Sequence, residues 1–161
     1  MESCSYDLGM FASNEITCKY LPYFFGNQYR FYPMVNVIIE SKLATGTRAL
    51  VDSGATNTFI PYGLAETIGL LPDDKSKLRK AMTTGASGKF ETLIIPLKNL
   101  QVFKENHVFE TFHGLPVYVA NDVKDPLPYV VLGRDSIFKR FDVSFCEDRR
   151  RIKFARRKNN Q

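Results

Sequence analysis

A carboxylate, a hydroxyl group and a glycine follow one another at Asp52-Ser53-Gly54, directly after the apolar run Ala49–Val51. The apolar run predicts a buried strand, and Gly54 predicts a turn in which other groups can approach the backbone closely. A carboxylate at the end of a buried strand is costly unless it is hydrogen-bonded or paired, and such placement tunes catalytic pKa values. The same tripeptide is also typical of a simple turn that closes a hairpin, so its meaning depends on the rest of the chain.

Two further segments accompany this turn. The apolar run Tyr129–Leu132 predicts a second buried strand, which ends at Gly133-Arg134 and leads into a short helical pattern. Between the two strands, small residues form the predicted tip of a hairpin that is flanked by strand-like sequence. This tip comprises Thr84, Gly85, Ala86, Ser87 and Gly88.

In these three segments, taken in order, the chain resembles the retropepsin-like aspartic proteases. In that family Asp-Ser/Thr-Gly-Ala follows an apolar strand, a glycine-rich flap comes next, and an apolar-apolar-Gly-Arg segment lies near the end. The resemblance implies an all-β fold, a closed acid-protease barrel with one or two short helices and one lobe per chain. It also implies an aspartic endopeptidase that needs no metal or cofactor. The protease domain is expected over 31–157, after an N-terminal arm and aromatic hairpin at 1–30 and before a disordered basic tail at 158–161.

The resemblance also assigns roles to the residues of the turn. Asp52 is the expected catalytic residue, and Ser53 is expected to hydrogen-bond across a dimer axis to the backbone of the other chain. Gly54 is expected to offer its N–H group to the carboxylate, and Ala55 and Thr56 are expected to line the substrate cleft.

The other two segments receive roles from the same resemblance. The flap residues 84–88 are expected to close over an extended peptide or an unfolded protein and to make strand-like hydrogen bonds with it. Gly133 and Arg134 are the expected structural support of the active-site turn. In the family this arginine pairs with an acidic side chain, and the equivalent neighbour in this chain is Thr56.

Aspartic-protease chemistry needs two carboxyl groups that face each other across one water molecule. One acts as general base toward the water, and the other, which is protonated, acts as general acid toward the carbonyl. The chain contains a single Asp-Ser-Gly, and Asp135 stands where the family begins a structural helix. A two-fold dimer would bring Asp52 to its own copy, so a homodimer is expected. The alternative is a catalytically silent module that keeps the fold and binds peptides or proteins.

Length and composition favour one small domain. A chain of 161 residues can bury a substantial core, and 8 prolines and 10 glycines among short β-branched runs favour an all-β architecture. The sequence contains no run of about 18 apolar residues, so no membrane helix is expected. The N-terminus lacks the pattern of a signal peptide. Cys4, Cys18 and Cys146 form no C-x-x-C pair, which favours reduced thiols and a cytoplasmic location. The spacing of His107 and His113 matches no metal site.

The formal net charge of +5 is concentrated near the C-terminus, in the basic residues between 149 and 158. A solvated hairpin and tail would account for these charges, and an electrostatic contact with an acidic partner or nucleic acid is the alternative. No nucleic-acid motif or aromatic interleaving accompanies them, so neither a nucleic-acid nor a membrane partner is expected.

The remaining pattern predicts short strands joined by turns. Aromatic residues around Gly26-Asn27 predict a hairpin, which either packs on the core or helps to form a dimer contact. Pro61 and Gly69 mark the start and stop of a short helix, and Pro96 marks an edge or a bulge. A second helix is expected over 134–141, a polar turn containing Gly46 over 42–47 and a proline-bearing loop over 123–128. Predicted strands cover 33–41, 48–52, 78–83, 90–95, 97–103, 108–112, 115–120, 130–132, 141–145 and 151–155.

Overall fold

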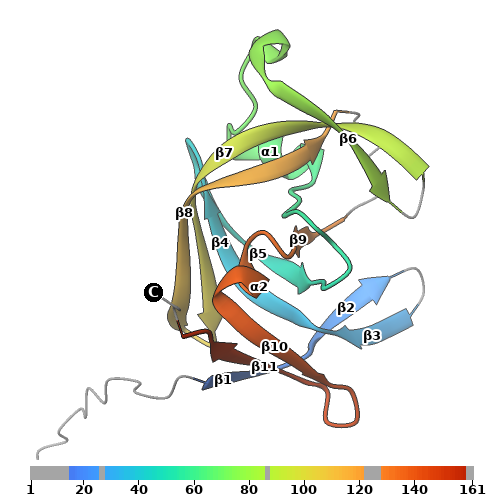
Figure 1. Ribbon diagram of the computed structural model, residues 1–161, viewed down its shortest axis with the longest axis vertical. Coiled ribbons are helices and arrows are strands. Elements are labelled where there is room, and N and C mark those ends of the chain that lie inside the picture. The colour runs from blue at the N-terminus through green and yellow to red at the C-terminus, as the bar shows by residue number, and fades with distance from the viewer. Residues whose placement is uncertain (1–14, 26–27, 86–87, 122–127, 159–161) are drawn as a thin grey trace, which may run out of the picture.

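The computed structural model describes residues 15–25, 28–85, 88–121 and 128–158, and these are mostly strand, as the composition predicts (Figure 1). The strands are β1 Glu15–Lys19, β2 Leu21–Phe25, β3 Gln28–Tyr32, β4 Met34–Glu40, β5 Ala44–Val51, β6 Arg79–Gly85, β7 Gly88–Lys104, β8 His107–Ala120, β9 Val130–Leu132, β10 Phe141–Cys146 and β11 Arg151–Arg156. The helical elements are α1 Tyr62–Thr67, the 3₁₀ turn η1 Lys75–Lys77 and α2 Ile137–Arg140. None of the helices in this part of the chain has the length and apolar character needed to cross a bilayer. The predicted N-terminal arm, flap residues Ala86 and Ser87, and most of the predicted loop 123–128 lie outside the described residues.

One six-stranded sheet carries most of the fold. Its strands follow the order β6-β7-β4-β5-β9, and β8 also pairs with β7. β4 and β5 form the predicted hairpin, but the prediction for its turn is wrong, because Gly46 lies inside β5. β5 also pairs in parallel with β9, with Ala49 opposite Val130 and Val51 opposite Leu132. The two predicted central strands therefore lie side by side, and the segments that follow them leave the sheet at the same edge.

β7 and β8 are long continuous strands, whereas the sequence predicts several short ones. Pro96 does not interrupt β7, where it lies opposite Pro116 of β8. On the other side of β7, pairing with β6 ends at Ile94 and pairing with β4 begins at Asn99. No strand on that side needs the N–H group that Pro96 lacks, so proline is tolerated within the strand. The register irregularity of β7 falls at residues 102–103 rather than at the proline.

The predicted closed barrel is not confirmed, because the sheet does not close through its strands within the described residues. The segment Thr58–Ile60, which belongs to no strand, lies between β8 and β9. Phe59 forms isolated bridges to Tyr118 of β8 and to Val131 of β9. Four backbone hydrogen bonds of 2.9 to 3.0 Å accompany these bridges. The strand-like pairing of this segment is thus limited to single bridges at Phe59.

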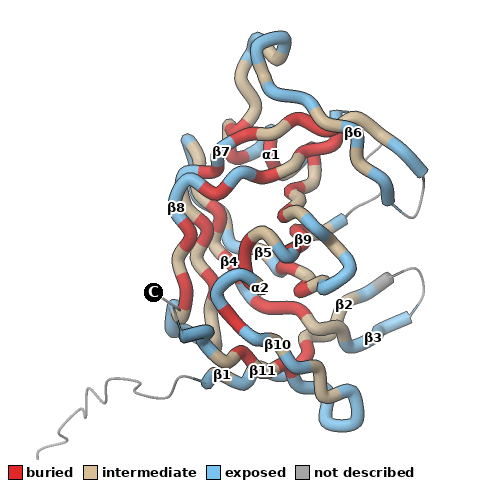
Figure 2. Tube along the Cα trace, in the orientation of Figure 1, coloured by how far each residue is buried: buried red, intermediate tan, exposed pale blue. Residues whose placement is uncertain are grey.

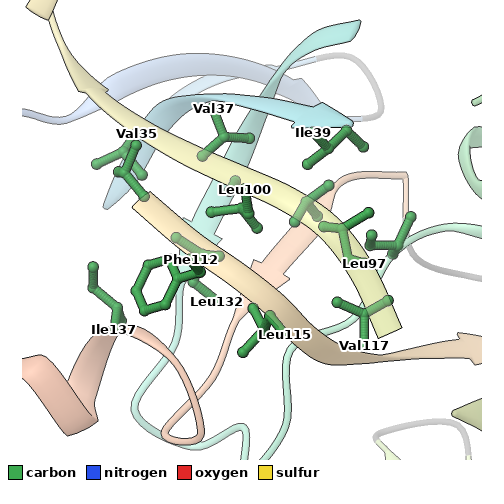
Figure 3. Close-up of a cluster of buried hydrophobic side chains, with 14 of the residues drawn as sticks. Val35, Val37, Ile39, Leu97, Leu100, Phe112, Leu115, Val117, Leu132 and Ile137 are labelled. Carbon is green, nitrogen blue, oxygen red and sulfur yellow. The ribbon is translucent and has the colours of Figure 1, made fainter. Parts of the chain in front are cut away.

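The hydrophobic core is lined by β4, β7, β8 and β9 (Figure 2). Alternate residues of β4 face it, since Val35, Val37 and Ile39 are buried whereas Asn36 is exposed. Figure 3 shows these side chains in one cluster with Leu97, Leu100, Phe112, Leu115, Val117, Leu132 and Ile137. Because this packing fixes both β4 and β9, it also fixes β5, which lies between them and ends at Val51, directly before Asp52.

A separate three-stranded sheet, in the order β1-β11-β10, joins the two ends of the described chain. β10 and β11 form the predicted C-terminal hairpin, and β1 pairs with the other edge of β11. The rings of Phe109, Phe141 and Phe154 pack together with centroids 5.3 to 6.0 Å apart. Since Phe109 belongs to β8, this aromatic cluster attaches the terminal sheet to the main one.

Beside this cluster, Glu110 of β8 is a buried carboxylate held by two arginines. Arg140 donates to Glu110 Oε1, and Arg156 Nη2 lies 2.9 Å from Glu110 Oε2. Arg140 also donates to the carbonyl of Thr111, and Arg156 to the carbonyl of Phe109. The two guanidinium groups thus tie α2 and β11 to β8.

Replacing Glu110 by Ala should lower the free energy of unfolding by about 2 to 3 kcal/mol, because it leaves two cations without their shared anion. The arginines are about half exposed, which places the loss at the lower end of the range for buried pairs. Urea denaturation measures the change. Glu66→Ala, at an exposed position of α1, is the matched control and should change the value by less than about 0.5 kcal/mol. Equal effects at the two positions would contradict a structural role for Glu110.

Candidate active site

Asp52 is the first residue after β5, and the backbone of β9 holds it in place. Its N–H group donates to the carbonyl of Leu132 at 3.1 Å, which extends the contact between the two strands by one residue. The chain then turns, with the N–H group of Ala55 3.3 Å from the Asp52 carbonyl oxygen. The N–H group of Gly54 donates to Asp52 Oδ1 at 2.8 Å. Asp52 is partly exposed and Ser53 and Gly54 are exposed, so the carboxylate lies at the surface end of a buried strand.

Gly54 also keeps the space beside the carboxylate open. A Cβ atom at this position would lie 3.1 Å from Asp52 Oδ1, closer than nearly all such contacts in proteins. A larger residue would therefore push the carboxylate away from the backbone N–H group that binds it.

A second segment, Gly133–Ser136, packs directly against the active-site turn. The N–H group of Arg134 donates to the Ala55 carbonyl at 2.9 Å, and that of Asp135 donates to the Thr56 carbonyl at 3.0 Å. The Arg134 guanidinium group donates from Nη2 to Thr56 Oγ1 at 3.0 Å. These bonds join the segment after β9 to the segment after β5. They also keep residues 133–136 in turns, so α2 begins later than the predicted position 134.

Gly133 lies where the two segments come closest. A Cβ atom at this position would lie 2.2 Å from the carbonyl oxygen of Asn57 and 2.6 Å from its carbonyl carbon. These distances are shorter than any that real Cβ atoms adopt. Only glycine therefore fits at this contact, and the requirement comes from space rather than from backbone conformation.

A buried hydroxyl network joins the same two segments. Thr58 Oγ1 donates to Asp135 Oδ1 at 2.7 Å and lies 2.7 Å from Ser136 Oγ. Ser136 in turn donates to the Gly133 carbonyl at 3.1 Å. Sequence reasoning did not find Thr58 or Ser136, because two hydroxyl groups so far apart in the chain form no local pattern. The one feature of the sequence that points to them is their position, since each follows a predicted central strand by a few residues.

Three tyrosines lie close together, and one of them, Tyr129, lies near Asp52; sequence reasoning did not predict this grouping. Tyr129, just before β9, packs edge-on against Tyr23 of β2, with the ring centroids 5.3 Å apart. Tyr23 also donates from its hydroxyl to the Pro128 carbonyl at 3.5 Å. Burial raises the pKa of the Tyr129 phenol, and the nearby Tyr32, Tyr23 and Asp52 raise it further. Tyr129 therefore contacts the β2–β3 hairpin and lies near the carboxylate of Asp52.

The predicted flap is the hairpin of β6 and β7, which projects on the same side of the molecule as the end of β5 (Figure 1). Its described tip residues Thr84, Gly85 and Gly88 are exposed, and Gly88 has a φ of 108°, which favours glycine. Farther from the tip, the buried Thr92 hydroxyl donates to the Ala81 carbonyl at 3.1 Å. The hairpin is therefore tied together along its arms while its tip stays exposed.

The structure thus brings the residues after both central strands into one hydrogen-bonded unit, whereas the predicted flap is a separate hairpin of β6 and β7. Asp135 belongs to this unit, but its carboxylate accepts the hydroxyl of Thr58. In the described part of the chain, no three side chains of the metal-binding types are grouped closely enough to hold an ion. His113 instead lies 2.6 Å from Asn99, with Nδ1 facing the amide oxygen.

Comparisons with known proteins agree with this arrangement. The model of the family described as "Aspartyl protease" matches residues 35–136, which include the active-site turn, the flap and the Gly133–Ser136 segment. Among solved structures, the fold is similar to a retropepsin-like aspartic protease from Rickettsia conorii, with a TM-score of 0.52 and 15% sequence identity. The similarity covers 87% of this chain and 88% of that one. No curated protein matches the chain. The chain belongs to the aspartyl protease family, and its fold is similar to that of a retropepsin-like aspartic protease.

Proposed function

We propose that the chain is one subunit of a homodimeric aspartic endopeptidase, which hydrolyses peptide bonds in extended peptides or unfolded proteins. The placement of Asp52 carries this proposal. Its carboxylate lies partly exposed at the end of a buried strand, in a turn that a second segment braces. Within the described residues, Gly54 supplies the one hydrogen bond to this carboxylate, so the group is available to a second partner.

The missing half of the site comes from a second copy. Aspartic-protease chemistry needs two carboxyl groups a few ångströms apart, and one chain offers one Asp-Ser-Gly turn. Asp135, the other candidate, is engaged by Thr58. A two-fold axis beside Asp52 would place two identical carboxyl groups face to face.

In the proposed dimer the two carboxyl groups share one proton, because two negative charges at such a short distance strongly disfavour ionisation of both. The ionised carboxyl group takes a proton from a water molecule as the water oxygen attacks the scissile carbonyl carbon. The protonated one donates its proton to the carbonyl oxygen. The carboxyl group that took the proton from water then gives it to the leaving nitrogen, and the other takes a proton back from a hydroxyl group of the tetrahedral intermediate as the C–N bond breaks. The apparent pKa values of this reaction belong to the pair rather than to either carboxyl group.

The neighbouring residues take their roles from the same arrangement. Ser53, exposed at the tip of the turn, would hydrogen-bond to the partner's backbone across the axis. Ala55 and Thr56 would line the cleft, and Arg134 would hold Thr56 in position through the bond described above. The flap residues 84–88 would cover the bound peptide and pair with its main chain.

A cytoplasmic location is also part of the proposal, and the state of the two described cysteines supports it. Cys18 and Cys146 are both free. Burial raises the pKa of the Cys18 thiol to about 11, so it stays protonated and unreactive at neutral pH. Free, unreactive thiols are typical of proteins in a reducing compartment.

Incubation of the full chain with a denatured protein tests the function directly. Cleavage is expected between about pH 3 and pH 7, where a carboxyl pair can hold a single proton. A peptide analogue with a hydroxyl-bearing tetrahedral carbon in place of the scissile carbonyl should block it, because such a group resembles the transition state. A metal chelator should leave the rate unchanged. A folded dimer that binds peptide without cleaving it at any of these pH values would contradict the proposal and identify a binding module.

A further inference from the structure

One face of the β2–β3 hairpin is both aromatic and exposed. The strand register places Phe24 opposite Tyr29 and Pro22 opposite Phe31, so these four side chains share one face, here called the aromatic face. The side chains of Phe24, Tyr29 and Phe31 are 56%, 72% and 47% exposed. The rings of Phe24 and Tyr29 contact each other with centroids 5.3 Å apart. Large exposed aromatic groups that lie together are typical of a binding surface.

Apart from the contacts at its base, no other described strand pairs with the β2–β3 hairpin. β2 and β3 pair with each other alone among the described strands, and an isolated two-stranded hairpin is only marginally stable in water. Its opposite face carries Tyr23 and Tyr32, which lie near Tyr129. Arg48 of β5 donates to the carbonyl of Pro22. The base is therefore anchored beside the active-site turn, while the aromatic face points away from that anchor.

The position of the hairpin decides which molecule can cover this face. In Figure 1 the flap and the β2–β3 hairpin project on the same side of the molecule, above and below the end of β5. The face that carries Tyr23 packs against Tyr129, which lies near Asp52, so the aromatic face is turned away from a peptide bound at Asp52. A subunit related by a two-fold axis beside Asp52 would approach from this side of the molecule, where the β2–β3 hairpin projects.

We propose that the aromatic face is a dimer clasp that a second copy of this chain covers. The inference rests on the proposed function, since that function places the two-fold axis beside Asp52. Aromatic residues are enriched at the centre of protein interfaces, where a few of them carry most of the binding free energy. Phe31 is partly covered by Arg150, whose guanidinium carbon lies 4.6 Å from the ring centroid. Phe24 and Tyr29 are therefore the positions that contribute most to the contact.

The test replaces both rings with threonine, which preserves strand propensity and removes the aromatic surface. In F24T/Y29T the dimer dissociation constant, measured by sedimentation, should rise by about thirtyfold or more, the effect of a single interface hot spot. Leu43→Ser is the matched control, because Leu43 is 62% exposed in the turn between β4 and β5. It should leave the dissociation constant unchanged. Circular dichroism should show the same fold for all three proteins.

Activity as a function of protein concentration separates a clasp from a substrate-binding surface. A clasp variant should lose activity when dilute and recover the wild-type activity per subunit once its concentration exceeds the raised dissociation constant. A raised KM at every concentration, with dimerisation unchanged, would overturn the clasp and assign the face to substrate. A wild-type dimer that is inert but dissociates in F24T/Y29T would refute the proposed function alone. An active wild-type protein whose dimer survives the double change would refute the clasp alone.

Discussion

Asp52→Asn is expected to abolish peptide-bond hydrolysis while the fold and the dimer survive. The amide cannot hold or release the shared proton, and in a homodimer one substitution removes both the general base and the general acid. The rate should fall by at least about 10⁴-fold. The turn should persist, because the amide oxygen can still accept the N–H group of Gly54. Cleavage of a denatured protein measures the loss, while circular dichroism and sedimentation report on the fold and the dimer.

Asp135→Asn is the matched control for this change. Its side-chain oxygen can still accept the hydroxyl of Thr58, and the proposed chemistry does not use it, so most of the activity should remain. Mixtures of wild-type and Asp52→Asn subunits add a second check. If one carboxyl group comes from each subunit, activity falls with the square of the wild-type fraction, to about one quarter at equal amounts. A linear decrease would show that each chain acts alone.

Among the glycines that the structure describes, Gly133 is where replacement by alanine should be most damaging. The new Cβ would overlap the Asn57 backbone, which cannot move aside as a flexible side chain would. Such overpacking should lower the free energy of unfolding by about 3 kcal/mol or more. It should also separate the two segments that position Asp52, so any protein that still folds should be inactive. Urea denaturation and the cleavage assay measure the two effects.

Gly63→Ala provides the comparison for this change. Gly63 lies in α1, and a Cβ atom there would meet nothing within 4 Å. Alanine is the better helix former, so stability should stay the same or rise by up to about 1 kcal/mol. If both changes had the same small effect, the close contact at Gly133 would not exist in solution.

The features that sequence patterns predicted well depend on neighbouring residues. The helix between Pro61 and Gly69 is set by residues at its own ends, and Gly69 adopts the positive φ of 65° that glycine favours. The apolar runs before Asp52 and Gly133 likewise predicted the two central strands. Motif order then indicated the family, which the match over residues 35–136 confirms.

The features that sequence patterns missed depend on residues far apart in the chain. Pro96 signals a break, but Pro116 faces it across the ladder and the other side needs no donor, so β7 continues. Gly114 has a φ of 61° within β8, yet long pairing with β7 keeps the strand in one piece. The Thr58 hydroxyl network and the position of Tyr129 beside Asp52 arise only when the two central strands come together. Local sequence carries no trace of either contact.

The parallel pairing of β5 with β9 determines when, during synthesis and folding, the candidate site can form. Residues 52 and 132 must meet before the backbone of Leu132 can hold Asp52, and the intervening chain includes the whole flap. Because contacts between distant residues form slowly, this step comes late in folding. A nascent chain that contains only the N-terminal two thirds of the sequence therefore lacks β9, and with it the Leu132 carbonyl that binds the N–H group of Asp52. The hydrogen-bonded unit around Asp52 can therefore assemble only after the last third of the chain has been synthesised.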